Sequence, residues 1–232
     1  MTVSSAVRQA RRQGIAVAVA TGLYGVSFGA LGVAAGLDVW QTCVLSLLMF
    51  TGGSQFAFVG VIASGGLAAA PSAIASAVLL GVRNAAYAVR MGPVVGGPWW
   101  RRVLAAPFTI DESTAVALAQ DEPAARRAGF WITGLGIFAT WNAMTLVGAL
   151  LGDVMGDVRA YGLDAAAAAA MLALLWPRLR SRQAVAVGAA AAVIAAALTP
   201  ALPAGLPVLV AAFTAVVVGW TNWLGGRTEH RA

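Results

Sequence analysis

The sequence predicts an all-α polytopic membrane protein, a fold class indicated by its composition, the length of its apolar runs and the position of its charges. Hydrophobic residues make up 60% of the 232 residues and charged residues only 10%, and the mean hydropathy is +0.81. Soluble domains do not have this composition. The apolar runs are roughly 18 to 25 residues long, enough to cross a hydrocarbon core of about 30 Å. We therefore expect one integral membrane domain over 1–232, with about seven or eight transmembrane segments.

The positive charge of the chain indicates its membrane topology. The net charge of +6 comes from arginine alone, because the sequence contains no lysine, and the arginines cluster between apolar runs. This distribution is typical of a topology signal and not of a nucleic-acid-binding surface, so no nucleic-acid partner is expected. We expect a multi-pass protein of the cell inner (plasma) membrane, and the positive-inside rule predicts that its N-terminus is cytoplasmic. Cys43 and His230 are the only cysteine and histidine, so we expect no disulfide, no metal site and no cofactor.

The first apolar run, 14–36, carries glycines spaced three or four residues apart. This spacing places them on one helical face, where small residues allow another membrane helix to approach closely. Tyr24 lies among them, and its hydroxyl group needs a hydrogen-bond partner. The glycines of this face are Gly22, Gly25, Gly29, Gly32 and Gly36.

A polar, glycine-paired interruption, FTGGSQF at 50–56, lies inside the second run. Glycine costs a helix about 1 kcal/mol relative to alanine, and serine offers the backbone competing hydrogen bonds. We therefore predict a broken helix near 51–54. At membrane depth, freed backbone groups are tolerated only where protein buries them or where they line a wet cavity, so this break is a candidate solute site. Ser54 and Gln55 either contact the solute or satisfy the broken helix.

Charged side chains interrupt two further runs. Arg83 and Asn84 lie in the middle of one, and an arginine in a membrane segment costs about 2.5 to 3.5 kcal/mol unless it faces a cavity, a protein interior or an acidic partner. Asp111 and Glu112 are adjacent in the run at 103–120. They are about 100° apart on a helix, so one is expected to face a cavity while the other caps or pairs. The alternative is an interfacial or re-entrant segment with both carboxylates in water.

The charges also restrict the number of membrane crossings between Asp38 and the arginine pair at 126–127. If Asp38 is outside and the arginines are inside, this number is odd. It is three if every run in this part of the chain spans the membrane, and one if some of them are re-entrant. The runs concerned are 41–63, 68–90 and 103–120.

Short internal similarities favour the larger count. We interpret them as two parallel repeats of about four spans each, a plan that some transporter folds use. The repeats would cover 1–125 and 126–232. The matching segments are 11–15 with 126–130 and 36–38 with 162–164.

The common catalytic motifs are missing from the sequence. It contains no HExxH, GxSxG or GxxxxGK[ST] motif, so we expect no enzyme and no ATP hydrolysis by this chain. The polar groups inside the runs instead suit a zwitterion with an apolar side chain. Its carboxylate can be met by Arg83 or by the backbone N–H groups of 52–54, and its ammonium group by Asp111 or Glu112.

The order and spacing of these elements resemble the AzlC family over about residues 14 to 224. The similar elements are Tyr24-Gly25, FTGGSQFA at 50–57, Arg83 with Tyr87, and TIDES at 109–113. One element departs from the family pattern, which is Asn-x-Arg-His around the arginine, whereas this chain has Gly81-Val82-Arg83-Asn84.

The resemblance implies the large subunit of a branched-chain amino acid exporter that works with a small AzlD-like membrane subunit. Our leading hypothesis is a proton-driven secondary transporter for branched-chain or similar hydrophobic amino acids, with Asp111 or Glu112 as the titrating group. The alternative is a channel-like or scaffold subunit in the lipid bilayer whose transport path lies in a partner. The predicted substrate-binding residues are Tyr24, Gly52, Gly53, Ser54, Gln55, Arg83, Asn84 and Tyr87.

Overall fold

The computed structural model describes residues 4–155, 172, 175–176 and 179–221, and within these residues it contains helices and no strand. The prediction of an all-α protein is therefore confirmed. Three helical stretches among the described residues are long and apolar enough to cross a membrane, namely Ser5–Ala34, Leu67–Val95 and Pro123–Met155. The elements are α1 Ser5–Gly22, α2 Gly25–Ala34, α3 Val39–Leu48, α4 Gly52–Gly65, η1 Leu67–Ala69, α5 Ala70–Val95, α6 Trp99–Ala105, η2 Ala106–Phe108, α7 Asp111–Leu118, α8 Pro123–Met155, α10 Arg182–Leu198 and α11 Leu206–Thr221.

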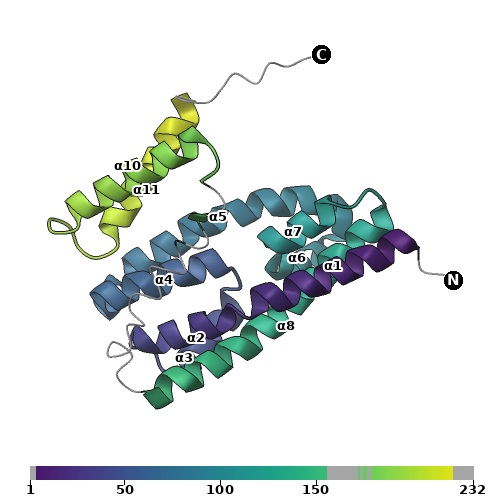
Figure 1. Cartoon of the computed structure of the whole chain (residues 1–232), viewed down its shortest axis with the longest axis horizontal. Helices are drawn as coiled ribbons and strands as arrows, with labels where there is room; N and C mark the ends of the chain where they lie inside the picture. Colours follow the sequence, from purple (N-terminus) through teal and green to yellow (C-terminus); the bar gives the residue numbers. More distant parts are fainter. Residues whose placement is uncertain (1–3, 156–171, 173–174, 177–178, 222–232) are drawn as a thin grey trace.

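Helices α1 and α2 form one nearly continuous rod that packs parallel to α8 (Figure 1). Thr140 Oγ1 donates to the Ala18 carbonyl at 2.9 Å, and further along both helices Gly29 lies against the backbone of Thr145 and Ala149. Since later positions of α2 meet later positions of α8, the two rods run in the same direction. Of the predicted glycine face, Gly22, Gly25 and Gly29 lie in this contact, where the missing side chains let the helices approach closely. Gly32 instead meets Thr42 of α3, and a Cβ at Gly36 would meet nothing within 4 Å.

Helices α3 and α4 form a re-entrant hairpin and not a membrane span. The hairpin starts at Asp38, whose Oδ1 accepts from the Gln41 N–H at 2.6 Å in a capping box. The chain then breaks at 49–51, just before the predicted position, and α4 begins at Gly52. The far end of α4 packs near Ala35, close to where α3 began. The hairpin therefore enters and leaves at the same end of the molecule.

Helices α6 and α7 form a second hairpin that enters from the opposite end. Helix α5 crosses to that end, where Arg127 Nε donates to the Val94 carbonyl at 3.2 Å. The chain then turns inward through α6 and η2, breaks at 109–110, and returns along α7. At the end of α7, Gln120 Nε2 donates to Gln13 Oε1 at 3.0 Å, beside the start of α1.

The tips of the two hairpins meet on α8. Each tip begins with a Phe-Thr pair, and the rings of Phe50 and Phe108 both pack edge-on against Phe138, with centroid distances of 4.9 Å and 5.5 Å. The two hairpins thus enter from opposite ends, and their tips meet in the middle of the bundle. Helices α10 and α11 form a separate hairpin beyond α5 (Figure 1).

This architecture changes the expected crossing count. Between Asp38 and the 126–127 pair, Leu67–Val95 is the only described helical stretch that is long and apolar enough to cross a membrane, so we expect one crossing there, in line with the re-entrant alternative for 103–120. The seven or eight expected spans are not confirmed. The length rule overcounted because an apolar run of about 20 residues can also be two half-helices that reverse direction. The repeats at 1–125 and 126–232 stay a proposal, because the match at 162–164 lies outside the described residues.

The single crossing predicts which side of the membrane each loop occupies. In a Cys43→Ser background, we expect Leu67→Cys to react with a membrane-impermeant maleimide from outside the cell, and Trp99→Cys to react only after the membrane is opened. Both side chains are well exposed, and the arginine-rich end is expected to be cytoplasmic. If Trp99→Cys reacted from outside the cell and Leu67→Cys only after the membrane was opened, the three-crossing interpretation would be favoured instead.

The glycine contact predicts a second measurable effect. In Gly29→Ala the new Cβ meets the Thr145 carbonyl, and overpacking of this kind costs typically about 1–3 kcal/mol. We expect a lower melting temperature and less folded protein in the membrane. The matched control is Gly60→Ala, which meets nothing within 4 Å on an exposed helix face and should leave both unchanged or slightly improved. Equal effects of the two substitutions would contradict the close packing of α2 and α8.

Candidate functional site

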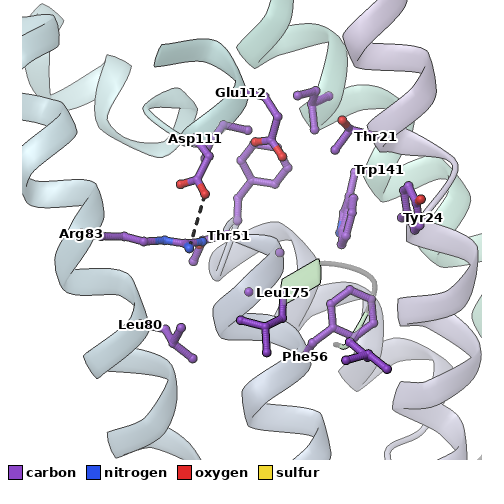
Figure 2. Close-up of a pocket in the computed structure, with 16 residues that line it drawn as sticks. Thr21, Tyr24, Thr51, Phe56, Leu80, Arg83, Asp111, Glu112, Trp141 and Leu175 are labelled. Carbon is purple, nitrogen blue, oxygen red and sulfur yellow. Dashed lines mark ion pairs between the residues drawn. The ribbon is translucent and has the colours of Figure 1, made fainter. Parts of the chain in front are cut away.

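A cavity of about 450 Å³ lies where the two hairpin tips meet. Its walls come from α1, the 49–51 break, α4, α5, α7 and α8, so segments distant in sequence form it together (Figure 2). A volume in this range is typical of small-molecule sites. The polar side chains that line it are Thr21, Tyr24, Thr51, Arg83, Asp111 and Glu112, and the apolar ones include Phe50, Phe56, Leu80, Ile110, Ile137 and Trp141.

Arg83 of α5 lines the cavity and is paired with an acid from the second hairpin. Its Nη1 lies 3.3 Å from Asp111 Oδ2, and the two side chains are 26% and 23% exposed. A Cβ added at Gly53 would lie 3.0 Å from Arg83 Nη2, so the guanidinium rests against the first turn of α4. The structure thus gives Arg83 both a cavity and an acidic partner, the two environments that its position in an apolar run required.

The start of α4 supplies further hydrogen-bond donors. Its N-cap residue, Thr51, makes no side-chain cap, and within the described residues the N–H groups of Gly52 and Gly53 find no acceptor. Such an end carries about half a positive elementary charge and binds anions readily. A Cβ at Gly52 would lie 3.4 Å from the Trp141 ring. The glycine pair therefore brings helix backbone close to both the guanidinium and the indole.

The acidic pair lies in the first turn of α7. Ser113 fixes this turn, because its Oγ accepts from the Ile110 N–H at 3.1 Å and donates to the Phe108 carbonyl at 2.6 Å. Both Asp111 and Glu112 line the cavity, and Figure 2 shows both carboxylates beside it. One of the two acids pairs as expected, namely Asp111 with Arg83, but both line the cavity, whereas only one was expected to face it. Helix α7 begins at the cavity, so every side chain of its first turn lies beside it. The angle of about 100° between Asp111 and Glu112 around the helix axis therefore does not keep either carboxylate away from the cavity.

The other predicted residues divide between the cavity and its surroundings. Tyr24 lines the cavity and is 51% exposed. Gln55 is fully buried, and its Nε2 donates to the Ser46 carbonyl at 3.2 Å, which bridges the helix break from α4 back to α3. Ser54 and Asn84 line a second cavity. Tyr87 lines neither of these two cavities.

Sequence reasoning missed Thr21 and Trp141. The Trp141 ring packs with Phe28 and Phe56, at centroid distances of 6.2 Å to each, so it joins α8 to α2 and α4. Its indole N–H is buried and has no acceptor in the described part of the chain. One signal was available: tryptophans of membrane proteins concentrate at the interfaces, whereas Trp141 lies in the middle of a span. Thr21 carried no comparable signal.

Comparison with known proteins places the chain in a family. A family model described as AzlC protein matches residues 16–155, more than half of the chain. The chain belongs to the AzlC family. AzlC is a transporter-associated family of membrane proteins related to branched-chain amino acid transport. The AzlC match contains both re-entrant hairpins and all of the cavity lining except Leu172 and Leu175. No curated protein and no solved structure matches the chain.

The hydrogen bond of Gln55 predicts a structural role for this residue. Gln55→Ala removes the donor to the Ser46 carbonyl and leaves a buried acceptor unpaired, at a cost of about 1–3 kcal/mol. We expect a lower melting temperature with unchanged amino acid affinity, measured by calorimetric titration of the purified protein. Arg83→Ala serves as the contrast, because it should abolish amino acid binding. A weakened affinity in Gln55→Ala without loss of stability would return this residue to the binding site.

Proposed function

We propose that this AzlC protein is the large subunit of a two-component permease that exports branched-chain or similar hydrophobic amino acids in exchange for protons. The observation that carries the proposal is the polarity of the cavity. Arg83 and the free N–H groups of α4 form a region that attracts a carboxylate, while Asp111 and Glu112 form one that attracts an ammonium group. Such a pair of regions matches the backbone of an amino acid.

The remaining walls favour an apolar side chain. Phe56, Ile137 and Trp141 line the cavity and belong to the same buried cluster as Ala18 of α1 and Phe28 of α2. No further charged side chain lines the cavity among the residues that the structure describes. A polar or charged substrate side chain would lose hydration there without gaining a partner, so aliphatic amino acids are favoured over polar ones.

The ion pair offers a route to proton coupling. A substrate carboxylate that binds Arg83 competes with Asp111, whose Oδ2 lies 3.3 Å from the guanidinium. Exchange requires that the substrate and the proton occupy the site in turn. The substrate ammonium group binds a carboxylate only when that carboxylate carries no proton, so in the proposed cycle the acidic pair of Asp111 and Glu112 holds either the ammonium group or a proton. The site releases the amino acid outside the cell and returns with a proton.

Substitution of the acids tests this mechanism. In cells loaded with labelled valine, Asp111→Asn and Glu112→Gln should each reduce export at least about 100-fold, the effect of losing roughly 3 kcal/mol of charge-assisted interaction. The amount of protein in the membrane should stay unchanged. Asp38→Asn is the matched control, because Asp38 caps α3 far from the cavity, and it should export normally. Full activity of both acid variants would remove the pair from the mechanism.

Reconstitution separates the permease from the alternative function. Liposomes that contain the chain together with its small membrane partner should take up labelled valine when a proton gradient is imposed, and the Arg83→Ala variant should not. If wild type and Arg83→Ala support equal uptake in the presence of the partner, the transport path lies in the partner. The chain would then be a channel-like or scaffold subunit.

A further inference from the structure

A second cavity of about 340 Å³ touches the same hairpin tip as the first. Phe50 and Thr51 line both cavities, but α5 contributes different residues to each. Leu80 and Arg83 face the first, whereas Gly81 and Asn84 face the second. No charged residue lines the second cavity within the described part of the chain. Its chemistry therefore differs from that of the proposed amino acid site.

The second cavity contains buried oxygen atoms that lack partners. Ser54 is 1% exposed, and its Oγ has no hydrogen-bond partner among the described residues. A Cβ added at Gly81 of α5 would lie 3.6 Å from this Oγ, so the glycine keeps the space beside the hydroxyl open. Asn84, one helical turn further along α5, has a buried Oδ1 that is also unpartnered in the described structure. Buried polar atoms normally have partners, so these two oxygens point to a ligand.

The C-terminal end of α3 lies beside the same cavity and leaves carbonyl groups without backbone partners. Within the described residues the carbonyl groups of Leu47, Leu48 and Phe50 accept no backbone hydrogen bond, and the Thr51 N–H, the i+4 donor for Leu47, turns back to the Met49 carbonyl at 2.7 Å. Leu48 and Phe50 line the second cavity. The C-terminal end of a helix carries a partial negative charge, and carbonyls at such half-helix ends hold cations in membrane transporters.

We propose that the second cavity binds a monovalent alkali cation, with Ser54 Oγ, Asn84 Oδ1 and carbonyl oxygens at the end of α3 as its protein ligands. All of these oxygens are neutral, which suits a singly charged ion, whereas protein sites for divalent cations normally contain carboxylates. The cavity is larger than one ion, so water completes the coordination shell.

The site gives the broken hairpin two faces of opposite polarity. Gly52 and Gly53 at the start of α4 line the first cavity, whereas Leu48 and Met49 at the end of α3 line the second. A cation bound in the second cavity contacts the 49–51 break, which also lines the first cavity. Binding of the cation therefore affects the segment that shapes the amino acid site. The proposal does not depend on the identity of the transported solute.

Thermal unfolding of the purified full-length chain tests cation binding directly. The melting temperature is measured in detergent with increasing NaCl or KCl, with N-methylglucamine chloride keeping the ionic strength constant. We expect a saturable increase in melting temperature with at least one alkali cation, because a ligand that binds only the folded state stabilises it. Identical melting temperatures in all three salts would overturn the proposal.

Substitutions locate the effect. Ser54→Ala removes one ligand without adding volume and should raise the half-maximal cation concentration about tenfold, which corresponds to the loss of one moderate interaction. Asn84→Leu should act similarly, and if that variant fails to fold, Ser54→Ala decides alone. The control is Ser64→Ala, since Ser64 already donates to the Val61 carbonyl at 3.0 Å outside the cavity. Equal half-maximal concentrations in wild type and Ser54→Ala would overturn the proposed site.

Leucine titration of the same samples distinguishes the two proposals. Arg83→Ala should lose leucine binding and keep the cation-dependent increase in melting temperature. If wild type shows the cation effect but binds no leucine, the proposed amino acid transport fails while the cation site stands.

Discussion

The ion pair between Arg83 and Asp111 is the interaction on which this architecture depends. An arginine within an apolar helix is costly in a membrane unless it gains a counter-charge and a polar surrounding. Helix α5 cannot supply these groups itself, so they come from elsewhere: the carboxylate from the start of α7, 3.3 Å away, and an open backbone from the start of α4 at Gly53. Both hairpins must therefore reach the middle of the bundle, and the cavity is the space that remains between them.

The hairpin tips solve a second problem, which is the exposure of backbone groups at membrane depth. Each break frees N–H and carbonyl groups, and these are tolerated only inside protein or in a wet cavity. At the first tip, Gln55 satisfies one carbonyl of α3. At the second tip, Ser113 bonds both to the Phe108 carbonyl and to the Ile110 N–H. The groups that remain unsatisfied lie beside the two cavities, which is why function is expected there and not on the continuous helices.

The continuous helices provide the frame. The α1–α2 rod and α8 touch through glycines, with Gly25, Gly29 and Gly148 against the backbone of the opposite helix. This close contact fixes Phe138 and Trp141 relative to Phe28. Phe138 packs against one phenylalanine from each hairpin tip, Phe50 and Phe108. These aromatic contacts position both tips, and with them the cavity, relative to the glycine interface.

The sequence by itself determined the fold class, the family and the chemical character of the site. Composition and apolar runs were sufficient for an all-α membrane protein, and the cost of burying charge was sufficient to single out Arg83 with Asp111 and Glu112. Only the tertiary structure decided the direction of each run, because a span and a pair of half-helices have the same hydrophobicity. It also separated Gly52 and Gly53, which face the first cavity, from Ser54, Gln55 and Asn84, which do not. Neighbours in sequence point in different directions once a helix forms, and which direction holds a cavity depends on helices that lie far away along the chain.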